Sequence, residues 1–582
     1  MTDDIRTTGL ARCAVGIMIA VIAGGCASSS PTAPSARSLQ APLTMIAPRS
    51  TCESMVARTI DASSIGLPTR GARVTAAETI APAGPSVDAD RKRSTLALPG
   101  YCKVLFEIDP VDPKAPPIKA QVNLPARWKQ ASLQVGGGGL NGSIPRNLAA
   151  IGPGGSPIGS VNPPDSPYPL TRGYATFGGD SGHQGDAGDW ALNDEAWLNF
   201  GHASLKKTRD AAHAIIALYY GERPRVGYFM GTSQGGREAL EVAQRYPDDY
   251  DGIVAHVPLI GYSAHVIHKT LLARAQANGE WISPEQAQRI GAEVLRQCDA
   301  LDGLRDGVID AYLACNARFD GANTPQALAP IRCAAGATDG THCLSDAQIA
   351  VVAQMHAPTR FGFALANGLD SFPGYGTGRE GLTGLNMKPE PKRPARPNLG
   401  QPGTTVQYGI IKDPALNLLD FTIDAYRARI VAASAIIDST NPDLSRFFAR
   451  GGRLIIRSSA SDYFVNPRTL WRYVETIEAR FGKDTVDRHV RLYVLPNGSH
   501  AGQSVSGLDG RTIPHHVDLI GMATDWVENG IVPPDAPVLR AMSPLPPFDV
   551  TATRPMCRYP LYPRYIGSGD PSRAEHFRCT QP

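Results

Sequence analysis

The chain has 582 residues, enough for one large domain with an insertion or for two domains, and its 42% hydrophobic and 19% charged residues are ordinary for a globular protein. The formal net charge is only +3, and no run of Lys and Arg is present that could neutralise a row of phosphates. We therefore expect no nucleic-acid partner.

The N-terminus has the pattern of an export signal rather than of a folded element. Arg6 and Arg12 precede an apolar stretch, Ala14–Ala23, and small residues follow at the point where a signal peptidase could cut. The stretch is too short to span a membrane as a helix. We predict that residues 1–26 direct export.

Two routes of processing remain open for this signal. Cys26 follows Ala-Gly-Gly and resembles the cysteine that becomes the lipidated first residue of bacterial lipoproteins, whereas plain cleavage after Ala27 is the alternative. The first route predicts a periplasmic or outer-membrane-anchored lipoprotein with a membrane tether through Cys26, and the second route allows secretion. Residues 27–50 are rich in Ser, Pro and Ala, which predicts a flexible tether.

Eight cysteines remain after the two in the export signal. Their spacing gives one wide pair and three close pairs, which in an exported protein predicts four disulfides in chain order. A zinc site is the alternative, but no CxxC or HxxxH spacing supports it. The eight are Cys52, Cys102, Cys298, Cys315, Cys333, Cys343, Cys557 and Cys579.

A glycine-rich turn around Ser233 carries the strongest chemical signal. The apolar run "VGYFM" before it reads as a buried strand, and "REALEVAQRYP" after it has helical spacing and stops at a proline. Gly231–Gly235 between them has the G-x-S-x-G pattern of the nucleophile elbow of α/β-hydrolases. The alternative is a tight turn that happens to contain a serine, and the strand-to-helix context favours the elbow.

A serine nucleophile of this type needs an acid and a base later in the chain, in that order. Asp462 and His500 each follow a short apolar run that predicts a strand, and α/β sheets place their sites at such strand ends. His515 and His516 are rival bases. They open a segment with amphipathic spacing, so we expect them to cap a helix and form its first turn.

A second glycine-rich segment, "LQVGGGGLNGS", suits the other half of an esterase site. A tetrahedral oxyanion needs preorganised backbone N–H groups, which the residue after the nucleophile, Gln234, and the bare backbone of Gly136–Gly139 could supply. The alternatives are a phosphate-binding loop or a flexible hinge. The segment lacks both a GKS or GKT ending and G-x-G-x-x-G spacing, which disfavours a nucleotide site.

The segment "CDALDGLRDGVID" contains three acidic residues and two glycines within a short loop. Asp299, Asp302 and Asp306 would offer hard oxygen ligands suited to Ca²⁺, and a solvated acidic turn is the alternative. Cys298 and Cys315 flank the loop, so a disulfide between them would hold this segment closed.

Together these segments resemble the tannase and feruloyl esterase family of exported α/β-hydrolases. The resemblance runs through "GGGGLNGS", "GTSQGGREALEVAQRYPDDYDGIVA", "CDALDGLRDGVIDAYLAC", "RLYVLPNGSH", "TDWVENGIVPP" and the tail "TRPMCRYPLYPRYIGSGDPSRAEHFRC". It implies a catalytic triad of Ser233, Asp462 and His500. It also implies that Gly139 and Gln234 supply the N–H groups of the oxyanion hole.

The resemblance further implies an α/β-hydrolase fold with a large inserted lid domain. The hydrolase domain would comprise residues 51–259 and 449–582, and the lid would comprise residues 260–448. In the family the three aspartates of the acidic loop bind a structural Ca²⁺ together with the backbone carbonyls of Leu304 and Val308. We therefore expect Ca²⁺ in the lid.

The function implied is hydrolysis of a small aromatic ester, phenolic or phthalate-type, through an acyl-enzyme in a monomeric protein. One departure bears on the site. The family usually has cysteines at the positions of Thr232 and Ala501, and their disulfide ties the elbow to the histidine loop. We expect packing to replace this tie, with the Thr232 hydroxyl bonding to that loop.

The alternative to an active esterase is a catalytically impaired cell-surface binding protein on a hydrolase scaffold.

Overall fold

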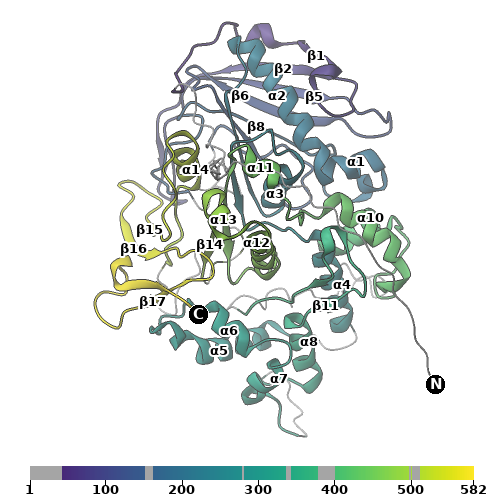
Figure 1. The fold of residues 1–582 in the computed structure, drawn as a ribbon, viewed down its shortest axis with the longest axis vertical. Helices are drawn as coiled ribbons and strands as arrows, with labels where there is room; N and C mark the ends of the chain where they lie inside the picture. Colours follow the sequence, from purple (N-terminus) through teal and green to yellow (C-terminus); the bar gives the residue numbers. More distant parts are fainter. Residues whose placement is uncertain are drawn as a thin grey trace, which may run out of the picture. The chain divides into compact units, whose positions relative to one another are not determined.

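A ten-stranded mixed sheet lies at the centre of the computed structural model (Figure 1). The structure describes residues 42–150, 162–277, 281–335, 342–377, 400–496, 498, 500 and 512–582. The predicted export signal and lipidation site lie outside these residues. Within them, every helix is too short or too polar to cross a membrane.

The antiparallel half of the sheet comes from four N-terminal strands: β1 (Thr59–Ile60), β2 (Ala72–Ile80), β5 (Tyr101–Ile108) and β6 (Ile118–Pro125). In β5 alternate residues are buried, which is the period of two expected for a strand with one covered face. A separate hairpin pairs β3 (Ser86–Asp88) with β4 (Arg93–Thr95).

The parallel half follows in the order β8-β7-β9-β10-β13-β14, and β6 joins it by pairing antiparallel with β8. Every residue of β9 is buried, as expected for a parallel strand that helices cover on both faces. The bounds are β7 (Ala131–Val135), β8 (Ala175–Gly179), β9 (Val226–Thr232), β10 (Gly252–His256), β13 (Arg453–Ser459) and β14 (Val490–Leu495).

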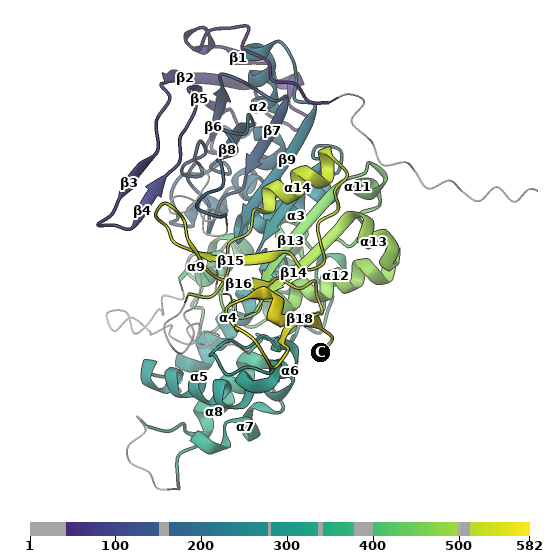
Figure 2. The same ribbon diagram turned by 90° about the vertical axis from the view of Figure 1, so that its left-hand side faces the viewer.

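Helices pack on the two faces of this parallel half (Figure 2). Tyr228 and Met230 of β9 share a hydrophobic cluster with helix α14 (Leu519–Glu528), whereas Phe229 points to the opposite cluster with α3 (Gln234–Arg245) and α12 (Pro467–Phe481). This alternation is the period of two of a strand buried on both sides. The remaining helices of this part are α1 (Asp194–Leu198), α2 (Ser204–Tyr220) and α13 (Lys483–His489).

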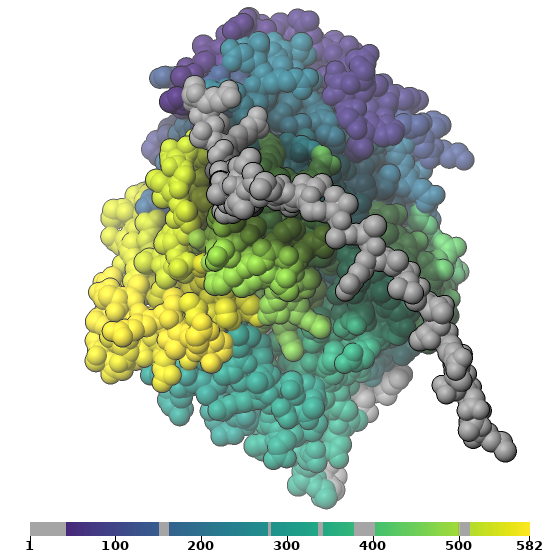
Figure 3. Space-filling view, viewed as in Figure 1, coloured from purple at the N-terminus to yellow at the C-terminus, as the bar shows by residue number. Residues whose placement is uncertain are grey.

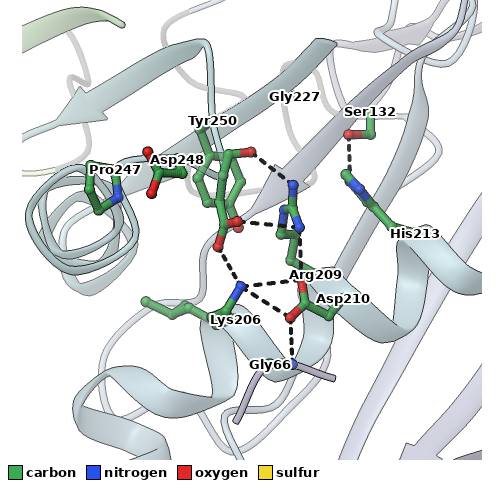
Figure 4. A network of polar contacts seen from close by, with 12 residues as sticks. Gly66, Ser132, Lys206, Arg209, Asp210, His213, Gly227, Pro247, Asp248 and Tyr250 are labelled. Carbon is green, nitrogen blue, oxygen red and sulfur yellow. Dashed lines mark hydrogen bonds and ion pairs between the residues drawn. The ribbon is translucent and has the colours of Figure 1, made fainter. Parts of the chain in front are cut away.

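A polar network fixes α2 to two other segments (Figure 4). Lys206 Nζ lies 3.1 Å from Asp210 and 3.0 Å from Asp249, and Arg209 bridges the same two carboxylates at 2.7 and 3.3 Å. The Gly66 N–H donates to Asp210 Oδ2 at 2.9 Å. The network thus joins α2 to the loop before β10 and to an N-terminal loop.

A long insertion separates β10 from β13, although these strands are neighbours in the sheet. Most of its buried apolar side chains share one hydrophobic cluster, which also includes Leu140, Ala191, Trp197 and Phe200 from earlier in the chain. Its elements are α4 (Tyr262–Ala277), α5 (Pro284–Cys298), α6 (Tyr312–Arg318), α7 (Thr324–Ala327), α8 (Asp346–His356), β11 (Thr359–Arg360), β12 (Ser371–Phe372), α9 (Gly400–Thr404), α10 (Arg427–Ile437) and α11 (Ser445–Ala449).

The C-terminal tail forms two hairpins beside this insertion, as the neighbouring yellow and teal surfaces show (Figure 3). The hairpins pair β15 (Val538–Met542) with β16 (Val550–Pro555) and β17 (Tyr562–Tyr565) with β18 (Phe577–Thr580). The prediction of four disulfides in chain order is confirmed. They join Cys52 to Cys102, Cys298 to Cys315, Cys333 to Cys343, and Cys557 to Cys579.

Candidate active site

Ser233 occupies a sharp turn between β9 and α3. Its φ of 61° and ψ of −115° are strained for a residue with a side chain. The turn is possible because its neighbours lack side chains: a Cβ on Gly231 would lie 2.1 Å from the Gly235 carbonyl oxygen, and one on Gly235 would lie 2.7 Å from the Gly137 oxygen. The elbow and the loop after β7 therefore touch through their backbones.

The structure brings the three predicted triad residues together. Ser233 Oγ donates to His500 Nε2 at 2.8 Å, and His500 Nδ1 donates to Asp462 Oδ2 at 2.9 Å. Asp462 Oδ1 also accepts the N–H groups of Phe464 and Val465, at 2.9 and 3.0 Å. The Asp462 side chain is 1% exposed and that of His500 is 21% exposed, so a fixed acid orients an accessible imidazole.

His515 and His516 lie elsewhere and do not start a helix. Helix α14 begins at Leu519, and its cap is the Asp518 side chain, which accepts the N–H of Gly521; the prediction that the two histidines cap it is wrong. Their ring centroids lie 3.9 Å apart, with the two ring planes tilted by 37°. Burial lowers the pKa of His515 to about 4 and that of His516 to about 3, which keeps both neutral.

The predicted oxyanion donors lie where two backbone segments meet. Gly139 has a φ of 62°, and Gln234 is the first residue of α3, whose N-terminus favours negative charge. Among the described residues, neither backbone N–H has a hydrogen-bond acceptor. Both donors are therefore free to receive an oxyanion.

Glu238, which sequence reasoning missed, holds this loop in place. It lies on α3 one turn past the elbow, fully buried, and burial raises its pKa. Its Oε2 accepts the Gly137 N–H at 2.9 Å, and its Oε1 accepts from Asn141 Nδ2 at 2.6 Å. The only sequence signal was a carboxylate on the apolar side of a short helix.

Thr232 does not tie the elbow to the described part of the histidine loop. Its hydroxyl is 3.1 Å from Nδ1 of His256 on β10, which is a contact within the sheet. His256 Nε2 lies 3.5 Å from Arg457, which donates to the His515 carbonyl at 2.9 Å. Ala501, the other position where the family has a cysteine, lies outside the described residues.

The acidic loop has the three predicted aspartates in one tight turn. Each carboxylate accepts a backbone N–H of the same loop: Asp299 that of Gly307 at 2.9 Å, Asp302 that of Leu304 at 3.0 Å, and Asp306 that of Val308 at 3.1 Å. No three His, Cys, Asp or Glu side chains of the described residues are arranged around a common metal position.

The charge of this loop is nevertheless unbalanced. Asp310 adds a fourth carboxylate, and Arg554 of β16 is the guanidinium that pairs with it, at 3.0 Å from Asp310 and 2.9 Å from Asp306. The second oxygen of Asp310 is buried without a hydrogen-bond partner among the described residues. Four acidic groups outnumber the two guanidinium groups near them, Arg554 and the Arg305 whose charge acts on Asp299, and this excess of carboxylates with an unpaired oxygen fits the charge and the oxygen chemistry of Ca²⁺.

The insertion also reaches the triad, through a lysine that sequence reasoning missed. Lys269 of α4 lies with its Nζ 5.5 Å from the centre of the Phe464 ring and 5.8 Å from that of Tyr375. Phe464 is 49% exposed, and its ring lies 4.9 Å from that of His500. Burial lowers the pKa of Lys269 to about 8, and the nearby Asp462 carboxylate opposes this shift.

A family model described as tannase and feruloyl esterase matches residues 102–580. The chain belongs to this family. It is therefore a carboxylic ester hydrolase, and the relatives give no support to the alternative of a non-catalytic binding protein.

Several curated relatives are similar over most of their length. The chain is 36% identical to an uncharacterized esterase of Agrobacterium fabrum, over 91% of this chain and 92% of that protein. It is 28% identical to the mono(2-hydroxyethyl) terephthalate hydrolase of Piscinibacter sakaiensis, over 84% and 86% of the two chains. It is also 28% identical to a probable feruloyl esterase of Arthroderma benhamiae, over 74% and 79%.

Solved structures share the fold. Feruloyl esterase B from Aspergillus oryzae superposes with a TM-score of 0.70 at 20% identity, covering 91% of this chain and 99% of that one. A tannin acyl hydrolase from Aspergillus niger superposes with a TM-score of 0.64 at 19% identity, covering 93% and 97%. Together with the four disulfides, the family places this esterase among exported proteins.

Proposed function

We propose that this esterase is a serine hydrolase that cleaves aromatic esters through an acyl-enzyme, with Ser233 as nucleophile, His500 as base and Asp462 as the acid that orients it. The observation that carries the proposal is the continuous chain of hydrogen bonds from Ser233 Oγ through the imidazole to the buried carboxylate, at 2.8 and 2.9 Å. This is the geometry that nucleophilic acyl transfer requires.

In the first half of the reaction, Ser233 Oγ attacks the ester carbonyl carbon while its proton passes to His500 Nε2. The carbonyl oxygen becomes an oxyanion, which the free N–H groups of Gly139 and Gln234 receive. The tetrahedral intermediate then collapses, the bond to the alcohol oxygen breaks, and the imidazolium returns its proton to the leaving alkoxide. Asp462 stabilises the imidazolium throughout.

In the second half, water takes the place of the alcohol. His500 removes one proton from this water as its oxygen attacks the acyl carbon, and the same two N–H groups receive the second oxyanion. Collapse of this intermediate breaks the bond to Ser233 Oγ, which recovers its proton from His500, and the carboxylic acid leaves. The net reaction consumes one water and one ester.

The aromatic character of the substrate rests on the relatives and on the side chains next to the imidazole. The names of two relatives specify feruloyl and terephthalate esters, both with aromatic acyl groups. The half-exposed Phe464 ring beside His500 offers a surface on which such a group could stack. We propose that residues 260–448 act as a lid over this surface, since α4 carries Lys269 to it.

We also propose that a structural Ca²⁺ binds the acidic loop. The carboxylates of Asp299, Asp302 and Asp306 would hold it with the backbone carbonyls of Leu304 and Val308. The ion would supply positive charge that offsets the repulsion among these carboxylates and would fix the loop, without taking part in ester cleavage. Crowded carboxylates and the unpaired oxygen of the fourth acid support this proposal.

The serine mechanism is tested by labelling and turnover. Ser233→Ala should abolish hydrolysis of an aryl ester and abolish covalent labelling by a serine-directed phosphonate, while circular dichroism stays unchanged. His500→Ala should lower kcat by roughly 10⁴-fold or more. His515→Ala is the matched control and should retain most activity, since the buried His515 ring bonds to the Ile513 carbonyl and makes no hydrogen bond to Ser233. Labelling that persisted in Ser233→Ala would assign the nucleophile to another residue.

A further inference from the structure

Lys269 lies in an environment that a lysine rarely occupies without a partner. Its side chain is 9% exposed, and its ammonium faces the rings of Tyr375 and Phe464. A charge taken out of water costs several kcal/mol unless another group compensates it. Cation–π contacts with the two rings offset part of that free-energy cost, but they leave the three N–H donors of the ammonium without acceptors among the described residues.

Comparison with the other buried cations shows how unusual this is. Six Lys and Arg side chains are buried in the described part of the chain, and five of them donate to carboxylates or carbonyl oxygens: Lys207, Arg237, Arg457, Arg491 and Arg554. Among the described residues, the ammonium of Lys269 has neither a hydrogen-bond acceptor nor a carboxylate at ion-pair distance. The protein thus provides the other five with acceptors and leaves this one open.

The ammonium of Lys269 is connected to the triad through the ring of Phe464. Phe464 lies two residues after Asp462, and its ring is 4.9 Å from the His500 ring and 5.5 Å from Lys269 Nζ. One aromatic ring therefore contacts both the base and the ammonium. A monocyclic acyl group with its ester carbon at Ser233 and its ring stacked on Phe464 would thus contact the same ring that the ammonium faces.

We propose that Lys269 binds an anionic oxygen group, a carboxylate or an ionised phenol, on the acyl part of the substrate. This inference rests on the proposed function, because it places the acyl group of an aromatic ester beside the triad. The ammonium would form charge-assisted hydrogen bonds with the anion in a site that excludes most water. Lys269 would then determine which aromatic esters the enzyme prefers.

A different role for Lys269 would give a different result. The ammonium is close enough to Asp462 for their charges to interact, so it could act only by adjusting the triad. Such an effect would apply equally to every ester, charged or neutral. A specificity role changes the ratio between a charged ester and a neutral ester of the same shape.

The test measures that ratio in Lys269→Met, which keeps the apolar stem and removes the charge. The substrates are the monomethyl esters of benzene-1,3- and benzene-1,4-dicarboxylic acid and their carboxamide counterparts, in which the free carboxylate becomes a neutral amide. A methyl 4-hydroxybenzoate whose electron-withdrawing ring substituents let the phenol ionise near neutral pH, where Lys269 keeps its proton, and its methyl ether form the phenol pair. Arg274→Met removes a cation from the same helix as a control, since Arg274 binds the Phe421 carbonyl.

We expect the ratio of kcat/KM for a charged ester to that for its neutral partner to fall roughly ten- to hundredfold in Lys269→Met and to stay unchanged in Arg274→Met. Lys269→Arg should recover much of it. The pair that responds identifies the carboxylate or the phenolate as the anion. An equal loss for charged and neutral esters, or no loss for either, would overturn the inference.

Binding of the free acids gives a readout that does not depend on turnover. By calorimetry the wild-type protein should bind a benzenedicarboxylate roughly tenfold or more tightly than benzoate, and Lys269→Met should lose this preference. Equal affinities for the two acids in the wild-type protein would overturn the inference. Failure of the wild-type protein to hydrolyse any ester, with the binding preference intact, would instead overturn the proposed function.

Discussion

Replacing Lys269 by Met should make this esterase more stable, because the native protein bears the cost of an uncompensated buried charge. Burial lowers the pKa of this lysine from 10.5 to about 8. At about 1.4 kcal/mol for each unit, the folded state holds the proton about 3 kcal/mol less favourably than the unfolded state does. Loss of the two cation–π contacts offsets part of this, so we expect a net gain of about 1–3 kcal/mol.

The gain in stability of Lys269→Met should decrease as the pH rises. Below pH 8 both states carry the proton, and the folded state bears the full cost. As the pH rises from about 8 to 10.5 the folded state releases the proton first, so the stability of the wild-type protein rises across this window. The advantage of Lys269→Met over the wild-type protein should therefore shrink between neutral pH and about pH 10.

Three titratable groups near Lys269 keep one charge state between about pH 8 and 10.5. Burial lowers the pKa of His268 to about 3 and that of His265 well below its usual value, so both stay neutral, and burial raises the pKa of Tyr375 well above its usual value. Asp462 and His500 are further titratable groups near the ammonium, and the ring of Tyr463 lies 4.5 Å from that of Phe464.

The assay is thermal unfolding of both proteins at neutral pH and at about pH 10. For a chain of this size we expect Tm to rise by about 1–3 °C at neutral pH. Lys207→Met is the matched control, because Lys207 is also buried but pairs with Glu195 at 3.1 Å, and its removal should lower Tm. A lower Tm for Lys269→Met, or a difference that does not change with pH, would refute the reasoning.

Three further outcomes are expected. Glu238→Gln should lower kcat roughly tenfold or more with little change in KM, because Glu238 holds the loop of Gly139, the proposed oxyanion donor, through Gly137 and Asn141. Kinetics on one ester would show this, and an unchanged kcat would contradict it. Chelation should lower Tm, and added Ca²⁺ should restore it; a Tm unmoved by chelator in protein without tightly held calcium would favour the solvated acidic turn. Thr232→Cys combined with Ala501→Cys should form a disulfide and stabilise the protein by up to a few kcal/mol, and two free thiols under oxidising conditions would place His500 away from the elbow.

The triad could be predicted from the sequence because its parts carry local signatures. Ser233 lies in a turn that glycines make possible, and Asp462 and His500 each follow an apolar strand. The four disulfide pairs could be predicted because each joins cysteines that are consecutive in the exported chain.

The groups that support the triad could not be predicted, because their roles depend on contacts between distant segments. Glu238 reads as one more charged residue of a helix until the loop after β7 packs against it, 101 residues earlier in the chain. Lys269 reads as a solvated lysine until α4 folds against Phe464. His515 and His516 were misread because a helix-like apolar spacing began before the true cap, Asp518.

The acidic loop depends on a C-terminal strand, because Arg554 of β16 pairs with two of its carboxylates. Asp310 and Asp306 meet their guanidinium only after a further 244 and 248 residues have been added. During synthesis and export, the loop therefore emerges long before the guanidinium that pairs with two of its carboxylates. A product that stopped short of β16 would contain Ser233, Asp462 and His500 but would lack Arg554. In such a product Asp306 and the buried Asp310 would have no guanidinium to pair with, so we expect a truncated chain to be less stable than the full chain.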